Sequence, residues 1–302
     1  MGVPLLSLLA LGVPLALWSA DPDPAQRVRG RLAGFRGVMG VAAKDLRTGE
    51  EILVDADRRF PTASVIKVAV MLEVFHRIAE GTLRADQEVA LPEAAKVGGS
   101  GVLVRLHAGL RPTVMDLVDL MITVSDNTAT NLLVELLGTA GIDARLAAYG
   151  LKETLLFRPT FRDGRPDVRP DLEKEFGLGM STPREMARLL ERIARGEAVS
   201  PAASAEMVRI LGAQLYGDMI PRGLPAGVSV AHKTGMDEEK VAGPGGRLRH
   251  IRADVGIVEG PQGRFVLAIF ARQVEDTGWS VDNEALVTGG EIARIVYDRF
   301  SR

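Results

Sequence analysis

The chain has 302 residues and contains no cysteine. This absence excludes disulfide bonds, thiol nucleophiles, thiolate metal sites and lipid attachment through an N-terminal cysteine. The sequence also lacks a charge bias, because its formal net charge is −2 and no run of like charges forms a tail. A protein with this balance is not expected to bind nucleic acid. With 46% hydrophobic residues, the chain has an ordinary globular composition and can form one large domain or two closely packed ones.

Lysine is scarce, with seven lysines against thirty arginines. Arginine does not lose its proton in a protein, whereas lysine can. A chain that uses arginine so freely still has lysine at positions 67 and 233. This choice mildly favours a chemical need for an amine at those two places.

Long apolar runs are also lacking, except at the N-terminus. Residues 3–18 are almost all apolar, and Ser19 and Ala20 follow them before a polar stretch. This pattern resembles a secretory signal in residues 1–20 and predicts a periplasmic or secreted protein. The alternative is an uncleaved membrane anchor formed by residues 3–18, although the run is short and interrupted by proline. Residues 21–35 are expected to be a linker or a first helix.

Strand patterns lie at both ends of the chain. They cover residues 38–43, 52–54, 228–232, 253–259 and 265–271. A long helical stretch separates the early strands from the late ones, and an amphipathic helix over residues 283–300 closes the chain. Early and late strands are therefore expected to share one antiparallel sheet.

The predicted fold class is α+β, an antiparallel sheet flanked by helices with an inserted all-α subdomain. One domain is expected over residues 36–302. Its α/β part would comprise residues 36–61 and about 213–302, and its all-α part about 62–212.

Two helix starts are marked by capping patterns. Thr113 has Asp116 three residues on, and Thr182 has Glu185 three residues on, with a proline directly after Thr182. Such patterns predict helix N-termini. Between these helices, the polar and proline-rich residues 158–178 are expected to form a long surface loop. Loops of that length are usually functional or disordered.

The stretch around Ser64 is a candidate for catalysis. Apolar residues at helical spacing follow it, so Ser64 is expected on the first turn of a helix, with Lys67 on the same face. A desolvated lysine has a lowered pKa and can take the proton of a serine hydroxyl, which is otherwise a poor nucleophile. Free N–H groups at the helix start can stabilise negative charge. Alone, however, a Ser-x-x-Lys pair is more often a surface lysine near a helix cap.

Two further short motifs lie downstream. Residues 125–127, Ser-Asp-Asn, interrupt the apolar pattern between two helices, where they could simply cap the second one. Residues 233–235, Lys-Thr-Gly, end a strand, where a lysine could simply discourage edge-to-edge association. A functional interpretation needs a cation and a hydroxyl beside a carboxylate, with the glycine allowing a substrate backbone to approach the strand.

Taken together and in this order, the three motifs resemble those of class A β-lactamases and penicillin-binding serine hydrolases. The resemblance continues along residues 125–133, along the strands before and after Lys233, and at the capped helix after Thr182. It covers roughly residues 30–300. It implies an α/β sandwich plus an all-α subdomain, with the active site in the cleft between them.

The resemblance implies acyl-enzyme chemistry. Ser64 would attack a β-lactam carbonyl, and Lys67 would take or relay its proton. Ser125 would pass a proton to the departing ring nitrogen, helped by Lys233. The backbone N–H groups of Ser64 and Met236 would form the oxyanion hole.

For substrate binding, the resemblance implies a second set of residues. Lys233 and Thr234 would hold the substrate carboxylate, beside Gly235. Asn127 would bond the side-chain amide of the substrate and the surroundings of Lys67.

The loop over residues 158–178 departs from the family pattern. Class A enzymes carry a glutamate there, closely after an arginine, that activates the deacylating water. No glutamate stands at the corresponding position of this sequence. Asp163 and Glu173 are the acidic candidates, and the deacylation base is left unassigned.

Three functions therefore stay open. The primary prediction is a monomeric serine β-lactamase that hydrolyses β-lactam antibiotics through an acyl-enzyme on Ser64. The alternative is a D-alanyl-D-alanine carboxypeptidase or transpeptidase of the penicillin-binding type, with a D-Ala-D-Ala peptide as its substrate. The third is a β-lactam-binding or peptidoglycan-binding domain that is acylated once and does not turn over.

The four histidines show no metal-ligand spacing, so neither a metal nor another cofactor is expected. His76 is expected to be structural, and His107 and His250 are expected in polar surroundings. His232 is expected to point away from the cleft, because side chains alternate along a strand.

Overall fold

The computed structural model describes residues 23–240, 242–243 and 246–302. The predicted signal or anchor in residues 1–20 lies outside the described residues, so export stays a prediction. Within the described ranges, no helix is both long and apolar enough to cross a membrane.

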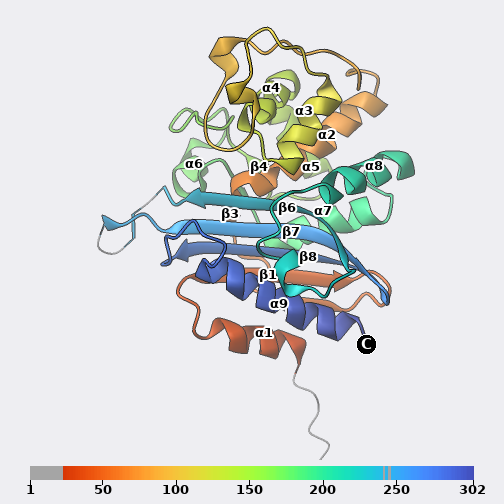
Figure 1. The fold of residues 1–302 in the computed structure, drawn as a ribbon, viewed down its shortest axis with the longest axis vertical. Helices are drawn as coiled ribbons and strands as arrows, with labels where there is room; N and C mark the ends of the chain where they lie inside the picture. The colour runs from red at the N-terminus through yellow and green to blue at the C-terminus, as the bar shows by residue number, and fades with distance from the viewer. Residues whose placement is uncertain (1–22, 241, 244–245) are drawn as a thin grey trace, which may run out of the picture.

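The centre of the molecule is a five-stranded antiparallel sheet with the strand order β2-β1-β8-β7-β6. Its strands, in chain order, are β1 (Val38–Asp45), β2 (Glu51–Val54), β6 (Ser229–Glu238), β7 (His250–Gly260) and β8 (Gly263–Val274). The five strand patterns predicted from the sequence fall on these five strands and are confirmed. So is the shared sheet, because β1 from the start of the chain pairs with β8 near its end (Figure 1).

The sheet separates two hydrophobic cores, because successive residues of a strand point to opposite faces. Val41 of β1 belongs to the smaller core, which the sheet shares with α1 (Pro24–Leu32) and α9 (Glu284–Phe300). Ala42 belongs to the larger core on the other face. Figure 1 shows α1 and α9 below the sheet and the remaining helices above or behind it.

The helical part is built around α2 (Lys67–Ala79). Residues 67–75 of this helix are all buried, including a lysine and a glutamate. Its neighbours are α3 (Val114–Thr123), α4 (Asn127–Leu137) and α5 (Thr139–Ala148). The α+β class predicted from the sequence is thereby confirmed.

Two longer helices connect the helical part to the sheet. α7 (Pro183–Ala194) packs on β1, β7 and β8, and α8 (Pro201–Gly212) contacts β6 and α3. The predicted division of the chain at residues 62 and 212 stays a prediction, and α7 falls within its helical part while packing on the sheet.

The remaining elements are short. A second, three-stranded sheet has the order β3-β5-β4, formed by β3 (Phe60–Pro61), β4 (Leu155–Leu156) and β5 (Gly179–Ser181). The 3-10 turns are η1 (Ala63–Ile66), η2 (Glu93–Ala95), η3 (Leu103–Arg105) and η4 (Pro221–Gly223). The small sheet joins the segment before η1 to both ends of the 158–178 region.

Three local predictions need correction. The Lys-Thr-Gly motif lies inside β6 and does not end the strand. The 158–178 region contains the helix α6 (Pro170–Phe176) and buried residues, so it is more than a surface loop. Thr182 caps α7, but the Glu185 carboxylate accepts hydrogen bonds from Glu153 N and Thr154 Oγ1, so only half of the expected capping box forms.

Candidate active site

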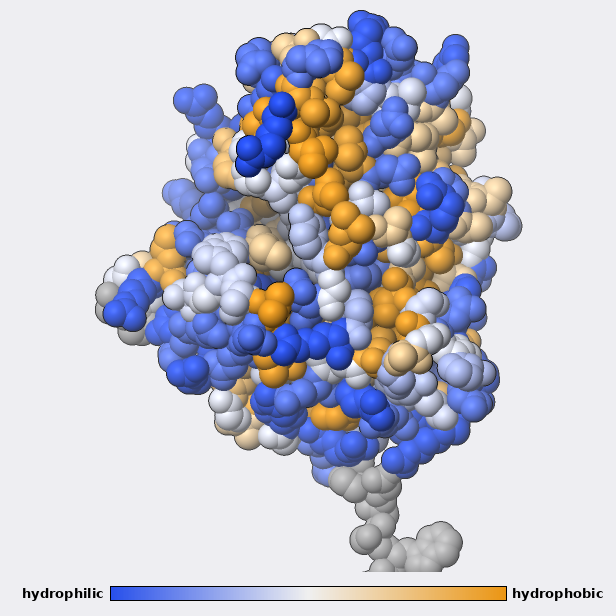
Figure 2. Space-filling view, in the orientation of Figure 1, coloured by the Kyte–Doolittle hydropathy of each residue, from blue (hydrophilic) through white to orange (hydrophobic). Residues whose placement is uncertain are grey.

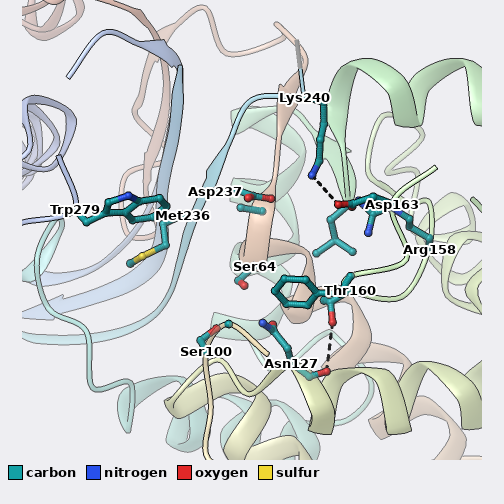
Figure 3. A pocket seen from close by; sticks show the side chains of 14 residues that line it. Ser64, Ser100, Asn127, Arg158, Thr160, Asp163, Met236, Asp237, Lys240 and Trp279 are labelled. Carbon is teal, nitrogen blue, oxygen red and sulfur yellow. Dashed lines mark hydrogen bonds and ion pairs between the residues drawn. The ribbon is translucent and has the colours of Figure 1, made fainter. Parts of the chain in front are cut away.

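Ser64 lies in the 3-10 turn η1, directly before α2, whereas the sequence predicted the first turn of the α-helix. Its side chain lines a cleft of about 420 Å³. Figure 2 shows the surface hollowed between the helical part and the sheet, and Figure 3 shows Ser64 inside. The preceding residue, Ala63, has φ of 43°, a left-handed conformation that is uncommon for a residue with a Cβ and that clusters at functional sites.

Lys67 is fully buried and donates three hydrogen bonds. Its Nζ lies 2.7 Å from Ser125 O, 3.1 Å from Ser125 Oγ and 2.8 Å from Asn127 Oδ1. Burial, followed by the neighbouring charge of Lys233, lowers the pKa of Lys67 well below its usual value. The structure therefore holds a lysine amine, biased toward its neutral form, one helical turn after Ser64.

Lys233 brings a second buried amine to the same hydroxyl. Its Nζ lies 3.2 Å from Ser125 Oγ and 2.9 Å from Thr234 O. Burial lowers the pKa of Lys233 to about 7, partly opposed by the charge of Asp254. Ser125 Oγ thus stands between two amines, and its residue is also left-handed, with φ of 57°.

Asp126 does not face the cleft but fixes the surrounding loops. It caps α4 by accepting from Ala129 N at 2.9 Å. Its other oxygen accepts from Val102 N and Leu103 N at 2.6 and 2.8 Å. The capping interpretation and the functional interpretation of the Ser-Asp-Asn motif are therefore compatible, because the cap holds Ser125 in place.

Sequence reasoning did not single out Ser100. It lines the cleft, and its Oγ donates to Ser125 O at 2.9 Å. Asn127 Nδ2 also donates to this loop, to Gly98 O at 3.1 Å. The Gly-rich sequence of residues 96–101 predicts only a flexible loop, because a short loop has no periodicity that would mark one of its residues.

Gly235 is required for the close approach of β6 to η1. A Cβ at this position would lie 2.7 Å from Thr62 O and 3.2 Å from Val65 N. β6 is an edge strand of the sheet, so it can present backbone groups and the Thr234 side chain along the cleft. Met236 and Thr234, which the sequence predicted as oxyanion and carboxylate contacts, lie on either side of this glycine.

Replacing Gly235 with alanine is expected to destabilise the protein by about 1–3 kcal/mol, because the added Cβ must push β6 away from the Ser64 turn. Urea unfolding measures the change. Gly30→Ala is the matched control, because no atom lies within 4 Å of its added Cβ and the site is an exposed helix. Equal stability of the Gly235 variant and the wild type would contradict this account of the contact.

The 158–178 region is fixed by a buried arginine. Arg158 Nε donates to Glu173 Oε1 at 2.8 Å, and its Nη2 pairs with Asp163. Glu173 is buried and also accepts from Gly164 N. Of the two acidic candidates from the sequence, Asp163 borders the cleft, whereas Glu173 is not among the residues that line it.

Thr160 lies two residues after Arg158 and lines the cleft. The Asn131 side chain makes two hydrogen bonds to the backbone of Thr160. Thr160 N donates to Asn131 Oδ1 at 2.8 Å, and Asn131 Nδ2 donates to Thr160 O at 3.1 Å. The Thr160 hydroxyl also donates to Asn131 Oδ1, at 2.9 Å. The side chain presented here is therefore short and neutral, and it cannot act as a carboxylate base.

The opposite wall of the cleft carries Trp279 and Met236 (Figure 3). The Arg252 guanidinium stacks 4.6 Å from the centroid of the Trp279 ring, and the His250 ring centroid is also 4.6 Å away. Burial lowers the pKa of Arg252 to about 10. The sequence gave no signal for this stack, because Trp279 stands alone in a polar stretch.

The histidines lie apart from the cleft. His232 is buried and bonds Asp254 Oδ1 through Nδ1 at 2.8 Å, and His76 bonds the Tyr149 hydroxyl at 2.7 Å. His250 is buried between a polar partner, Arg252 Nη2 at 2.9 Å from its Nδ1, and the aromatic ring of Trp279. In the described ranges, no group of three or more histidine or acidic side chains could hold a metal ion.

Comparison with known proteins agrees with this geometry. The β-lactamase of Sphaerobacter thermophilus is 29% identical, with 92% of this chain and 96% of that chain covered and a TM-score of 0.76. An ancestral class A β-lactamase is 28% identical, with 92% and 100% covered and a TM-score of 0.76. A mutant of PBP-A, in an acyl-enzyme complex with penicillin G, is 25% identical, with 92% and 96% covered and a TM-score of 0.77. A family model described as the β-lactamase enzyme family matches residues 23–300, and the chain belongs to that family.

Proposed function

We propose that this protein is a serine hydrolase of the class A β-lactamase type, which opens β-lactam rings through an acyl-enzyme on Ser64. The observation that supports it most is the meeting of two buried amines at Ser125 Oγ, 3.1 Å from Lys67 Nζ and 3.2 Å from Lys233 Nζ. Burying two lysines costs stability, because burial penalises each charge. A chain that keeps both amines at this place is therefore expected to use them in its chemistry.

In the proposed acylation, neutral Lys67 takes the proton of the Ser64 hydroxyl as Oγ attacks the β-lactam carbonyl. The proton then moves from Lys67 to Ser125, to which Lys67 is already bonded at 3.1 Å. Ser125 delivers its own proton to the ring nitrogen as the amide bond breaks. Lys233, at 3.2 Å from Ser125 Oγ, favours this transfer while it carries its charge.

Binding would use the edge of the sheet. Lys233 and Thr234 would hold the substrate carboxylate, and Asn127 would bond the side-chain amide. The N–H groups of Ser64 and Met236 would stabilise the oxyanion, a contribution that is often the largest single one in acyl transfer. The alignment of η1 beside β6, which depends on Gly235, supports this arrangement.

A penicillin-binding D-alanyl-D-alanine peptidase is the second candidate. Thr160 favours it, because a neutral side chain at this place in the loop offers no carboxylate for hydrolysing the acyl-enzyme. The structural similarity to PBP-A points the same way. The third candidate, a binding domain, would use the same acylation step but would never hydrolyse its acyl-enzyme.

Intact mass measured against time after addition of benzylpenicillin tests the proposal. A transient adduct of one penicilloyl group, with many turnovers of a chromogenic cephalosporin, is the expected result. A persistent adduct together with release of D-alanine from a D-Ala-D-Ala peptide would support the second candidate. No adduct at all would reject acyl-serine chemistry.

The pH profile should reveal the second amine. Because the pKa of Lys233 lies at about 7 in the free protein, its charged form is lost as the pH rises through that value. We expect kcat/KM for a β-lactam to fall on the alkaline side of about pH 7, since the charged amine holds the carboxylate. Lys233→Arg is the matched variant, because a guanidinium keeps its charge. An alkaline fall that persists unchanged in this variant would show that another group is titrating.

A further inference from the structure

Hydrolysis of the acyl-enzyme needs a base for water, and the cleft offers two carboxylates. Asp163 and Asp237 are the acidic residues that line it. Both oxygens of Asp163 are engaged, Oδ1 by Arg158 and Oδ2 by Lys240 Nζ at 3.2 Å. Each oxygen of Asp163 therefore already has a cationic partner, which leaves neither oxygen free to hold a water molecule.

Asp237 is differently placed. It lies on β6, two residues after Gly235, so its side chain leaves the strand on the same face as that glycine. That face is turned toward η1, because a Cβ on Gly235 would meet Thr62 and Val65. In Figure 3, the carboxylate of Asp237 lies above Ser64, on the side of the cleft where Lys240 meets Asp163.

One oxygen of Asp237 is available to a water molecule. Oδ1 accepts from Glu238 N at 2.9 Å. Oδ2 has no hydrogen-bond partner among the residues that the structure describes. The side chain is partly buried, and burial raises the pKa of Asp237 above its usual value. The hydrogen bond from Glu238 N and the charges of Lys240 and Arg158 oppose this rise, and the charge of Asp163 assists it. A carboxylate of raised pKa is a better proton acceptor near neutral pH.

We propose that Asp237 is the catalytic base that activates the deacylating water, in the cleft space that the short Thr160 side chain leaves open. This inference rests on the proposed function, because it needs an acyl group on Ser64. It places the base for deacylation on β6, whereas the candidates from the sequence, Asp163 and Glu173, both lie in the 158–178 region.

The step balances as follows in atoms and protons. Asp237 Oδ2 takes one proton from water while the water oxygen bonds to the acyl carbon. The tetrahedral intermediate collapses with cleavage of the bond between that carbon and Ser64 Oγ. The proton held by Asp237 returns, relayed by water in the cleft, to Ser64 Oγ. The products are the free carboxylic acid and the original serine.

Two rates test the proposal separately, the rate at which the benzylpenicillin adduct forms and the rate at which it decays, both by intact mass. For Asp237→Asn we expect adduct formation within a few-fold of the wild type and decay slowed by ~10²-fold or more. The wild-type decay rate should rise with pH as Asp237 loses its proton, and this rise should vanish in the variant. Glu238→Gln is the matched control, because it removes the same charge from the neighbouring, exposed position.

Each other outcome overturns the assignment in a recognisable way. Decay of the Asp237→Asn adduct within three-fold of the wild type rules Asp237 out. Slowed decay in Asp163→Asn but not in Asp237→Asn transfers the role to Asp163. A wild-type adduct that forms and never decays removes the need for any base and leaves the peptidase candidate. A wild type that forms no adduct refutes the proposed function itself and this inference with it.

Discussion

Replacement of Ser64 with alanine is expected to abolish covalent labelling by benzylpenicillin, because the proposed mechanism forms the acyl bond at the Ser64 hydroxyl. The fold should survive. The hydrogen bonds that satisfy Lys67 run to Ser125 and Asn127, so removing Ser64 Oγ leaves them intact. Unfolding free energy should therefore change by only about 0.5 kcal/mol.

Intact mass with penicillin and urea unfolding are the two measurements for this variant. Ser229→Ala, on the exposed start of β6, is the control and should label normally. Labelling of the Ser64 variant at the wild-type rate would mean that penicillin reacts elsewhere, and the whole acyl-serine scheme would be wrong.

The residues around Ser125 were predictable because each motif is short and lies on one element. Ser64 and Lys67 are fixed relative to each other by the turn that joins them, and residues 125–127 by a helix cap. The convergence of these elements with Lys233 could not come from spacing, since 108 residues separate Ser125 from Lys233. It came from the resemblance to a family, and the structure brings the same side chains within hydrogen-bond distance.

Other parts of the cleft could not be predicted, because they depend on contacts that have no period in the sequence. Arg158 and Glu173 are 15 residues apart and meet only because the loop folds back through α6. Asp237 is followed directly by Glu238 and Glu239, and no pattern in the sequence distinguishes it from them. Asp237 becomes a candidate base because its Oδ1 accepts from Glu238 N while its Oδ2 has no partner among the described residues. These contacts are visible only in the folded structure.

Replacing Arg158 with methionine is expected to have the largest effect on stability, about 3–5 kcal/mol, because Glu173 would be left as an unpaired buried charge. Arg158 is 2% exposed and Glu173 is 5% exposed, so water cannot compensate without opening the loop. We expect rapid proteolysis within residues 157–178, a lowered melting temperature and weaker retention of Thr160 in the cleft.

Two further variants distinguish an unpaired buried charge from lost packing as the cause of the instability. In Arg158→Met combined with Glu173→Met, both charges are gone and much of the stability should return, because a buried pair is often replaced by apolar residues at little cost. Arg84→Ala breaks an ion pair that is largely exposed and should leave the stability almost unchanged. If the single and double Arg158 variants were equally unstable, the loss would arise from packing and not from an unpaired charge.

The sheet that carries the cleft has one further consequence, for synthesis of the chain. β1 lies between β2 and β8, and Val38 pairs with Arg272, so the hairpin made first must wait for almost the last strand. Contacts so distant along the chain form slowly and leave apolar strand edges uncovered in the meantime. A nascent chain that stops short of β8 cannot complete its sheet. Its emerging hairpin is therefore the segment that a holding chaperone should contact during translation.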